Sequence, residues 1–398
     1  AIMKGTRIQR SDTMRTPDLN WLKDSRIFQV NRLQAYSDHK YTIGKDKKPS
    51  SFSLNGTWKF NQSKNFDTCF KFFYNTEFND SNWNDIQVPG HIQLQGFDNP
   101  HYTDVTYPWD GHDVVKPGQI DMDKNKVYQY RKTFDCPQDF IGNKLILSFE
   151  GVESNIYVWL NGKFIGYSED SFTPSRFDIT KYTQEKDNVL SVRIFQKCTG
   201  TWLEDQDMWR FSGIFRDVMI YKQPSLHIQD LKIDTEIDLD TNKSVLSCVC
   251  KMSSNESHTL QAKLYDPQGN IVWNGNMQDT FEIPVENTCL WSSEFPNLYQ
   301  FELVLYDTNN EIIETIQEQV GFRKFTLEYG IMKLNGKRIV FHGINRHEWD
   351  SKTGRCLSQE QMEEDIHILK SLNINAIRTS HYPNNSYWYK LCDQYGIY

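Results

Sequence analysis

The chain has 398 residues, a length that predicts two or three domains rather than one. Its formal net charge of -8 is mild and evenly spread, and the lack of a long basic run argues against a nucleic-acid partner. No apolar run approaches the ~18 residues of a membrane-spanning helix, so a membrane is not an expected partner either.

The first part of the chain is predicted to form an extended arm, residues 1–50, and then an all-β domain, residues 51–222. The clearest hairpin covers 156–167 and folds back at Asn161-Gly162. Asn-Gly adopts the positive φ angles that a tight hairpin turn requires. Together with the apolar runs on either side, this hairpin indicates a β-sandwich or jelly roll.

Residues 223–328 are predicted to form a second, smaller β-sandwich of the immunoglobulin type. Short alternating segments such as 301–305 are separated by turns such as 266–269, which has proline second and glycine fourth. The eight cysteines show neither a disulfide nor a zinc spacing, and Cys248 and Cys250 lie in an alternating segment typical of a sheet core. We therefore expect reduced cysteines and a cytoplasmic location.

Beyond residue 328 the pattern changes to strands that alternate with helices. We predict strands at 339–341 and 374–377, and a third that opens at Ile397. Polar groups follow both strands, as on the rim of a (β/α)8 barrel, where the active site lies. Residues 329–398 therefore begin a TIM-barrel domain. Two strands would leave apolar faces and strand edges uncovered, so we expect the chain to be part of a longer polypeptide.

Two helices are predicted in this barrel segment. The first begins at Ser358, with Gln361 completing a capping box, and the second begins near Asn385 and ends at Gly396. Apolar residues at helical spacing predict the buried faces, namely Met362, Ile366 and Leu369, then Tyr387, Trp388, Leu391 and Cys392.

An acidic loop at 203–210 is the most informative segment of the chain. It reads Leu-Glu-Asp-Gln-Asp-Met-Trp-Arg and places three carboxylates between a leucine and a tryptophan. Carboxylates accept hydrogen bonds from sugar hydroxyls, and an indole covers an apolar sugar face. The composition of the loop therefore favours a carbohydrate site over a plain surface loop.

Other short motifs recur in one order along the chain. They are Leu54-Asn55-Gly56-x-Trp58, Val88-Pro89, Tyr102-Thr103-Asp104-Val105-Thr106-Tyr107-Pro108, Phe149-Glu150-Gly151-Val152, the acidic loop, 290–299, Gly321-Phe322-Arg323, 343–348 and 378–383. In this order they resemble the β-galactosidases of glycoside hydrolase family 2. The resemblance implies a multidomain, mainly β protein, with a jelly-roll β-sandwich, an immunoglobulin-like β-sandwich and the first β/α units of a TIM barrel.

The resemblance also implies roles for four residues. Asp207 would bind galactose hydroxyls and contribute an oxygen to a sodium ion, which prefers hard oxygen ligands. His347 and His381 would hydrogen-bond sugar hydroxyls, and Arg378 would hold the nucleophilic carboxylate and keep it ionised. The alternatives are a surface or helix-capping aspartate, histidines of ordinary core or surface positions, and an arginine paired only structurally inside the barrel.

Neighbours of these residues have less specific expectations. Glu204 and Asp205 are expected to orient the loop through bonds to the backbone. Asn345, Arg346 and Glu348 could support either the site or the barrel.

Asp104 departs from the family pattern, in which most relatives carry asparagine. An ionised aspartate only accepts hydrogen bonds and adds negative charge beside the catalytic acids. If Asp104 lines the pocket, it should alter sugar affinity or raise the pKa of an acid nearby. The alternative is a turn aspartate.

The whole polypeptide is expected to hydrolyse terminal β-D-galactosides such as lactose with retention, through a covalent galactosyl-enzyme. Both catalytic glutamates and most ligands of a magnesium ion would lie beyond Tyr398, so the isolated chain is predicted to be inactive. The family also predicts a homo-oligomer. Two other interpretations stay open. One is a non-catalytic carbohydrate-binding or assembly subunit that needs a partner chain, and the other is β-glucuronidase or β-mannosidase specificity.

Overall fold

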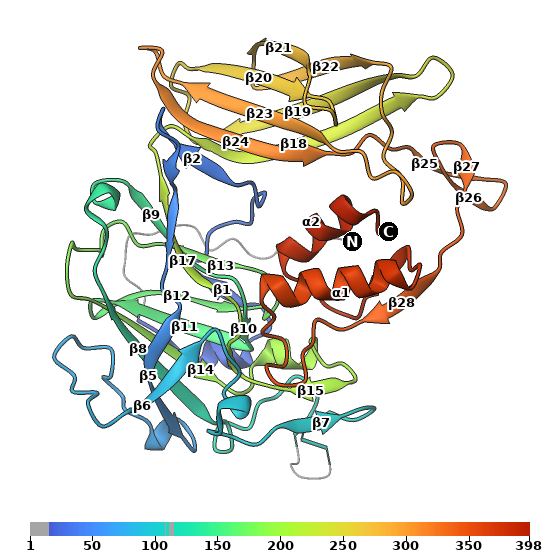
Figure 1. Ribbon diagram of the computed structural model, residues 1–398. Coiled ribbons are helices and arrows are strands. Elements are labelled where there is room, and N and C mark those ends of the chain that lie inside the picture. The colour runs from blue at the N-terminus through green and yellow to red at the C-terminus, as the bar shows by residue number, and fades with distance from the viewer. Residues whose placement is uncertain (1–15, 108, 111–114) are drawn as a thin grey trace. The chain divides into compact units, whose positions relative to one another are not determined.

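The computed structural model describes residues 16–107, 109–110 and 115–398, which form two compact units (Figure 1). Unit 1 comprises the chain up to Gln34, Ser51–Lys222 and Trp349–Cys356. Unit 2 comprises Ala35–Ser50, Gln223–Glu348 and Leu357–Tyr398. Residues 1–15 of the expected arm and Pro108 of the Tyr102–Pro108 motif lie outside the described residues.

Unit 1 is built around a β-sandwich. One sheet has the strand order β1-β12-β11-β14-β8-β5-β6, with β1 Gln29–Val30, β5 Gly56–Ser63, β6 Asn84–Val88, β8 Val127–Phe134, β11 Asn155–Leu160, β12 Lys163–Glu169 and β14 Asn188–Phe195. The facing sheet has the order β13-β9-β17-β4, with β4 Ser51–Ser53, β9 Lys144–Phe149, β13 Ser175–Asp178 and β17 Val218–Gln223. Short pairs complete the unit: β7 His101–Thr103 with β15 Met208–Arg210, and β10 Val152–Glu153 with β16 Gly213–Ile214. Short 3-10 helices lie at η1 Leu19–Lys23, η2 Phe66–Thr68, η3 Gln93–Gln95, η4 Gln138–Phe140 and η5 Thr199–Trp202.

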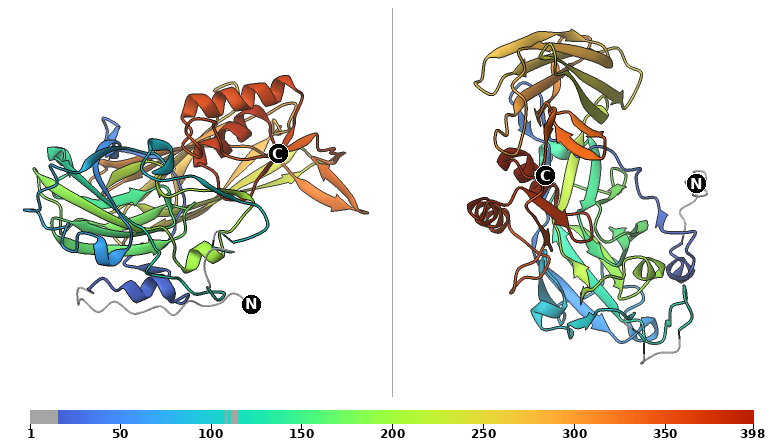
Figure 2. Two further views of the ribbon diagram at one scale, coloured as in Figure 1. Left: turned by 90° about the horizontal axis from the view of Figure 1, so that it is seen from below. Right: turned by 90° about the vertical axis from the view of Figure 1, so that its right-hand side faces the viewer.

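The predicted hairpin 156–167 is confirmed as β11 and β12, and β11 is buried on both faces. Its alternate residues Ile156, Val158 and Leu160 join the core between the sheets. Tyr157 and Trp159 point the other way and pack in a second cluster that includes Trp21 and Leu22 of η1. The first described residues therefore cover the outer face of the larger sheet, as the dark-blue segment shows (Figure 2).

Unit 2 contains a second β-sandwich. One sheet has the order β18-β19-β22, with β18 Ile228–Asp238, β19 Lys243–Met252 and β22 Thr280–Glu286. The other has the order β21-β20-β23-β24-β2-β3, with β2 Tyr41–Ile43, β3 Lys48–Pro49, β20 Thr259–Tyr265, β21 Ile271–Met277, β23 Tyr299–Tyr306 and β24 Ile312–Val320. The alternation predicted at 301–305 and at 246–250 is confirmed, because every second side chain there is buried in one core. All eight cysteines are free.

The last part of unit 2 changes from antiparallel to parallel strands. An antiparallel ribbon of β25 Phe325–Glu328, β26 Ile331–Leu334 and β27 Lys337–Arg338 precedes the parallel pair β28 Gly343–Arg346 and β29 Ala376–Thr379. Two helices, α1 Gln359–Ser371 and α2 Ser386–Tyr395, lie side by side and share one apolar cluster (Figure 1). Neither described helix is long and apolar enough to cross a membrane.

Both helix predictions are confirmed. Ser358 caps α1 in a capping box with Gln361, and Asn385 caps α2. Gly396 ends α2 in the left-handed conformation, which glycine adopts at low cost.

The strand predicted at 339–341 is wrong, since the first parallel strand lies at Gly343–Arg346. Val340 and Phe341 are exposed, and near them the side chain of Asn375 takes the place of a partner strand. Its amide donates to the Val340 carbonyl at 2.9 Å, and its oxygen accepts from the His342 N–H at 2.8 Å. The second strand is likewise displaced, from 374–377 to Ala376–Thr379.

These shifts place Asn345 and Arg378 within the strands rather than beyond them.

The expected third strand position is confirmed by hydrogen bonding, because Ile377 donates to the Tyr398 carbonyl at 2.9 Å and Tyr398 donates to that of Asn375 at 2.8 Å.

Candidate functional site

In unit 1, the acidic loop leads into a two-stranded ribbon of β7 and β15. Tyr102 lies opposite Trp209 in the register, and their rings are 5.5 Å apart. Asp104 directly follows β7 and Asp207 directly precedes β15, so both carboxylates lie at the same end of the ribbon. The Tyr102 hydroxyl donates to Asp207 Oδ1 at 2.5 Å, and both carboxylates are exposed. We call this set of four side chains the ribbon face.

The two carboxylates of the ribbon face act electrostatically on the Tyr102 hydroxyl. The pKa of Tyr102 is raised, chiefly by its hydrogen bond to Asp207, then by partial desolvation and by the charges of Asp207 and Asp104. Asp104 therefore lies close enough to act on this group. Two carboxylates beside two aromatic rings provide hydrogen-bond acceptors and apolar stacking surface together, the combination that a sugar ring uses.

Asp207 fits the role of one oxygen ligand for a sodium ion. Its Oδ1 accepts a hydrogen bond from Tyr102, and its side chain is exposed to solvent. Within the described residues, no three His, Cys, Asp or Glu side chains are grouped so as to hold a metal ion. Asp207 thus offers a single oxygen ligand. The described residues hold no cluster of ligands for the expected magnesium ion.

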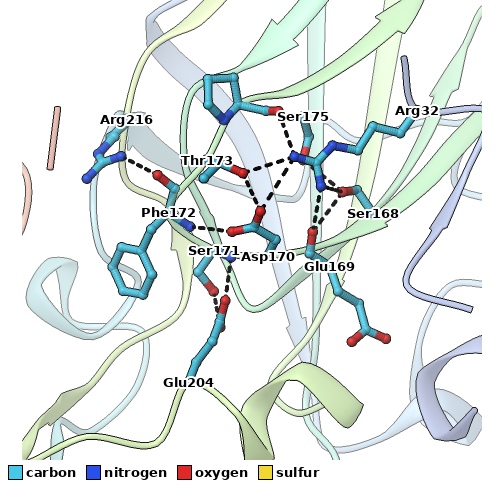
Figure 3. A network of polar contacts seen from close by, with 11 residues as sticks. Arg32, Ser168, Glu169, Asp170, Ser171, Phe172, Thr173, Ser175, Glu204 and Arg216 are labelled. Atoms are coloured by element: carbon cyan, nitrogen blue, oxygen red, sulfur yellow. Dashed lines mark hydrogen bonds and ion pairs between the residues drawn. The ribbon is translucent and has the colours of Figure 1, made fainter. Parts of the chain in front are cut away.

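Glu204 anchors the acidic loop to Ser171 (Figure 3). Its two carboxylate oxygens accept from the Ser171 backbone N–H at 2.7 Å and the Ser171 hydroxyl at 2.6 Å. Burial raises the pKa of Glu204 to about 7, against the opposing effect of these bonds. The prediction that Glu204 orients the loop through the backbone is confirmed. Asp205 instead forms an ion pair with Arg210.

The segment 168–175 that receives Glu204 is itself held by arginines (Figure 3). Arg32 donates to the Thr173 hydroxyl and the Pro174 carbonyl, both at 3.0 Å. Arg216 donates to the Phe172 carbonyl at 2.8 Å. The acidic loop is therefore tied to the connection between β12 and β13, which these two arginines hold by hydrogen bonds.

A cavity of about 170 Å³ lies within unit 1 beside the loop. Among its lining residues are His101 and Arg210, which face each other across the ribbon, together with Glu153, Glu204 and Asp205. The three carboxylates that line it are bonded to their neighbours in unit 1.

In unit 2, the two predicted histidines come together where the parallel strands end. The His347 and His381 rings are 5.9 Å apart and nearly perpendicular, and His347 Nδ1 lies 3.4 Å from the Tyr382 hydroxyl. Arg378 lies opposite Asn345 in the strand register, and both are exposed. The strand ends thus present two imidazoles, an amide and a guanidinium.

Arg346 and Glu348, by contrast, support the barrel segment. Arg346 is buried, binds Asp365 Oδ2 through Nε at 3.0 Å and Nη2 at 2.6 Å, and lies 3.6 Å above the Trp388 ring. Glu348 is buried and accepts from the Asn385 N–H at 2.9 Å, at the start of α2. Of the three residues whose role was open, only Asn345 remains exposed.

Sequence reasoning missed Arg355, which unit 1 buries almost completely although it follows β28 in the chain. Arg355 forms an ion pair with Glu153 and donates to the Trp209 carbonyl at 3.1 Å. Its backbone N–H donates at 3.0 Å to Nε2 of His91, whose pKa is held well below its usual range by burial and then by the Arg355 charge. Arg355 and Glu153 are 202 residues apart, so no local pattern indicates the pair.

Two β-sandwiches followed by the start of a parallel β/α barrel, with acids and aromatics on a ribbon, define a family 2 glycoside hydrolase. Family models confirm this assignment. Residues 52–224 match the sugar binding domain of glycosyl hydrolases family 2, 226–323 match a further domain model of that family, and 325–398 match its TIM barrel domain. The chain belongs to glycosyl hydrolase family 2.

Within that family, the chain is similar to curated β-galactosidases. It is 48% identical to the β-galactosidase of Halalkalibacterium halodurans, a match that covers 96% of this chain and 39% of that protein. It is 42% identical to the β-galactosidase large subunit of Leuconostoc lactis, covering 96% of this chain and 64% of that one. The chain thus spans between about two fifths and two thirds of the length of these relatives.

Solved structures confirm the fold. The β-glucuronidase of Bacteroides uniformis superimposes with a TM-score of 0.71 at 22% identity, over 87% of this chain and 41% of that chain. A β-glycosidase of Bacteroides vulgatus gives 0.70 at 24% identity. At these identities the likeness concerns the architecture alone.

Proposed function

We propose that the polypeptide to which this chain belongs is a retaining β-galactosidase that hydrolyses terminal β-D-galactosides such as lactose. The observation that carries the proposal is the ribbon face, where Asp207 and Asp104 lie beside Tyr102 and Trp209. The similarity to curated β-galactosidases supports this specificity over that of a β-glucuronidase or β-mannosidase. A glucuronide would also need a cation for its carboxylate, whereas the ribbon face offers acids.

In the proposed mechanism this chain binds and orients the sugar. Asp207 accepts hydrogen bonds from galactose hydroxyls, and the imidazoles of His347 and His381 form others. Arg378 holds the nucleophilic carboxylate and keeps it ionised. The two catalytic carboxyl groups of a retaining enzyme lie about 5–5.5 Å apart, and we assign both to glutamates outside this chain. The 398 residues alone are therefore expected to be inactive.

Two cations belong to the proposal. Asp207 would give one oxygen to Na⁺, which would offset negative charge beside the bound sugar. Mg²⁺ would be held mostly by ligands outside this chain. We also infer a homo-oligomer, and a cytoplasmic location because the eight cysteines are free.

Kinetics of the complete polypeptide on nitrophenyl glycosides test the proposal. Asp207→Asn should lower kcat/KM for the galactoside about 10- to 100-fold, the usual effect of losing a hydrogen bond to a charged group. The exposed Glu185→Gln in the same unit is the control and should change nothing. A preference for the glucuronide or mannoside, or an unaffected Asp207→Asn variant, would contradict the proposal.

A second candidate is an assembly subunit whose barrel is completed by another chain. It is favoured by the relatives from Leuconostoc lactis and Lactobacillus helveticus, which are named large subunits. The activity of the purified natural polypeptide separates the two, because the matched large subunits are themselves longer than this chain. Activity without any added chain indicates a barrel completed within one polypeptide, and activity only after a partner chain is added indicates an assembly subunit.

A further inference from the structure

The strand that carries the ribbon face is held from behind by a buried ion pair. Arg355 is 1% exposed, and its guanidinium meets the Glu153 carboxylate and the Trp209 carbonyl. The other Glu153 oxygen accepts a hydrogen bond from the Phe211 N–H, at an N–O distance of 3.4 Å. The pair therefore binds β15 and the residue after it at two backbone positions, on either side of Arg210.

The segment around Arg355 is fixed by further contacts inside unit 1. Trp349 stacks on Phe211 at 5.6 Å and 16°, and the Cys356 thiol donates to the Phe215 carbonyl at 3.1 Å. The Arg355 guanidinium also lies 5.2 Å from the Phe211 ring. Residues 349–356 thus form one packed layer beneath the end of the acidic loop.

The chemistry of this contact needs an arginine. A planar guanidinium directs separate N–H groups toward a carboxylate and a carbonyl at fixed angles, whereas a lysine ammonium acts as a single compact charge. A lysine could neutralise Glu153, but its shorter side chain and tetrahedral ammonium would not reproduce the two fixed directions of the guanidinium. Charge compensation and backbone placement can therefore be separated by substitution.

We propose that Arg355 is a positioning residue for sugar binding, which acts by fixing the Asp207–Trp209 backbone through Glu153 and the Trp209 carbonyl. This inference rests on the proposed function for its kinetic consequence, but its structural part does not. Arg355 itself is buried, so its guanidinium is not available to a ligand at the surface.

The experiment uses the complete polypeptide with Arg355→Lys, Arg355→Met and the double variant Glu153→Gln/Arg355→Met. The double variant removes the buried unpaired charge that Arg355→Met alone would leave. Arg131→Lys is the matched control, because Arg131 is also a buried arginine of unit 1 that is paired with an aspartate and with backbone carbonyls, but at Asp80 and Phe73. Two quantities are measured for each variant: amide hydrogen exchange of peptide 203–211, and kcat and KM for a nitrophenyl galactoside.

The expected result is exchange in 203–211 at least tenfold faster in all three Arg355 variants, including the double variant, and unchanged in Arg131→Lys. KM should rise about tenfold while kcat changes less than about threefold, since the displaced groups bind the sugar rather than react with it. Unchanged exchange in Arg355→Lys would overturn the inference whatever the activity. Faster exchange with an unchanged KM would overturn the link to sugar binding. If the wild type does not hydrolyse galactosides but hydrogen exchange still rises in the Arg355 variants, the proposed function is refuted and the structural role is supported.

Discussion

The stability of unit 1 should depend on pH in part through the carboxyl group of Glu204. Its side chain is buried against Ser171, and its pKa is raised from the ordinary 4.5 to about 7, mainly by that burial. In the unfolded chain Glu204 loses its proton near 4.5, whereas in the folded protein it keeps the proton until about pH 7. Unfolding between these values therefore releases a proton, so stability falls as pH rises.

The magnitude follows from the two pKa values. Each pKa unit corresponds to about 1.4 kcal/mol, so the shift from 4.5 to about 7 amounts to about 3 kcal/mol once the pH exceeds the folded value. Below pH 4.5 the effect vanishes, because both states are protonated. Glu204→Gln should remove this dependence, since an amide keeps an acceptor for the Ser171 N–H and a donor for its hydroxyl but does not ionise.

Urea unfolding of wild type and Glu204→Gln at several pH values between 4 and 9 measures the difference. The two should be similar near pH 4.5, and the variant should become more stable by about 2–3 kcal/mol by pH 8. Exposed Glu185→Gln serves as the control and should follow the wild type. Parallel stability curves for wild type and Glu204→Gln would refute the reasoning, because they would mean that Glu204 ionises alike in both states.

Three further substitutions test other parts of the structure. Gly396→Ala should cost about 2 kcal/mol in urea unfolding, because Gly396 has a φ of 70° and an added β-carbon would collide with the Ser293 carbonyl. Arg346→Met should cost about 2 kcal/mol by the same assay, since it strips Asp365 of its buried partner; a loss below 0.5 kcal/mol would contradict the structural role. Asp104→Asn should change KM for a galactoside, as it removes one charge from the ribbon face, and an unchanged KM would indicate a turn aspartate.

The sequence predicted best those features whose cause is local. Ser358 and Gln361 are three residues apart and cap α1 whatever surrounds them, and Asn161-Gly162 turns its hairpin by its own backbone preference. The strand at 339–341 was misplaced because the register is set by β29 and by Asn375, more than 30 residues away. An apolar run marks a strand only where a partner exists to pair with it.

The candidate site shows the same division. The family resemblance implied a binding role for Asp207, and Glu204 was expected to orient the loop through the backbone; the structure gives Glu204 its partner at Ser171. Asp205 and Arg210 are five residues apart, yet their pairing depends on the turn into β15 rather than on a helical or strand spacing. Arg355 could not be found at all, since its partners come from two distant segments that only the folded chain brings together.

The assembly of unit 1 from separated segments has a consequence for synthesis on the ribosome. The sandwich strands end at Gln223, but residues 349–356 that complete the unit are translated 126 or more residues later. At ~5–20 residues per second this delay is on the order of 10 s, during which Glu153 lacks its guanidinium partner. Until the barrel segment emerges, the nascent sandwich therefore lacks residues 349–356, which pack beside β15. A chain cut after Gln223 should remain in that state indefinitely, as a sandwich in which Glu153 has no arginine partner.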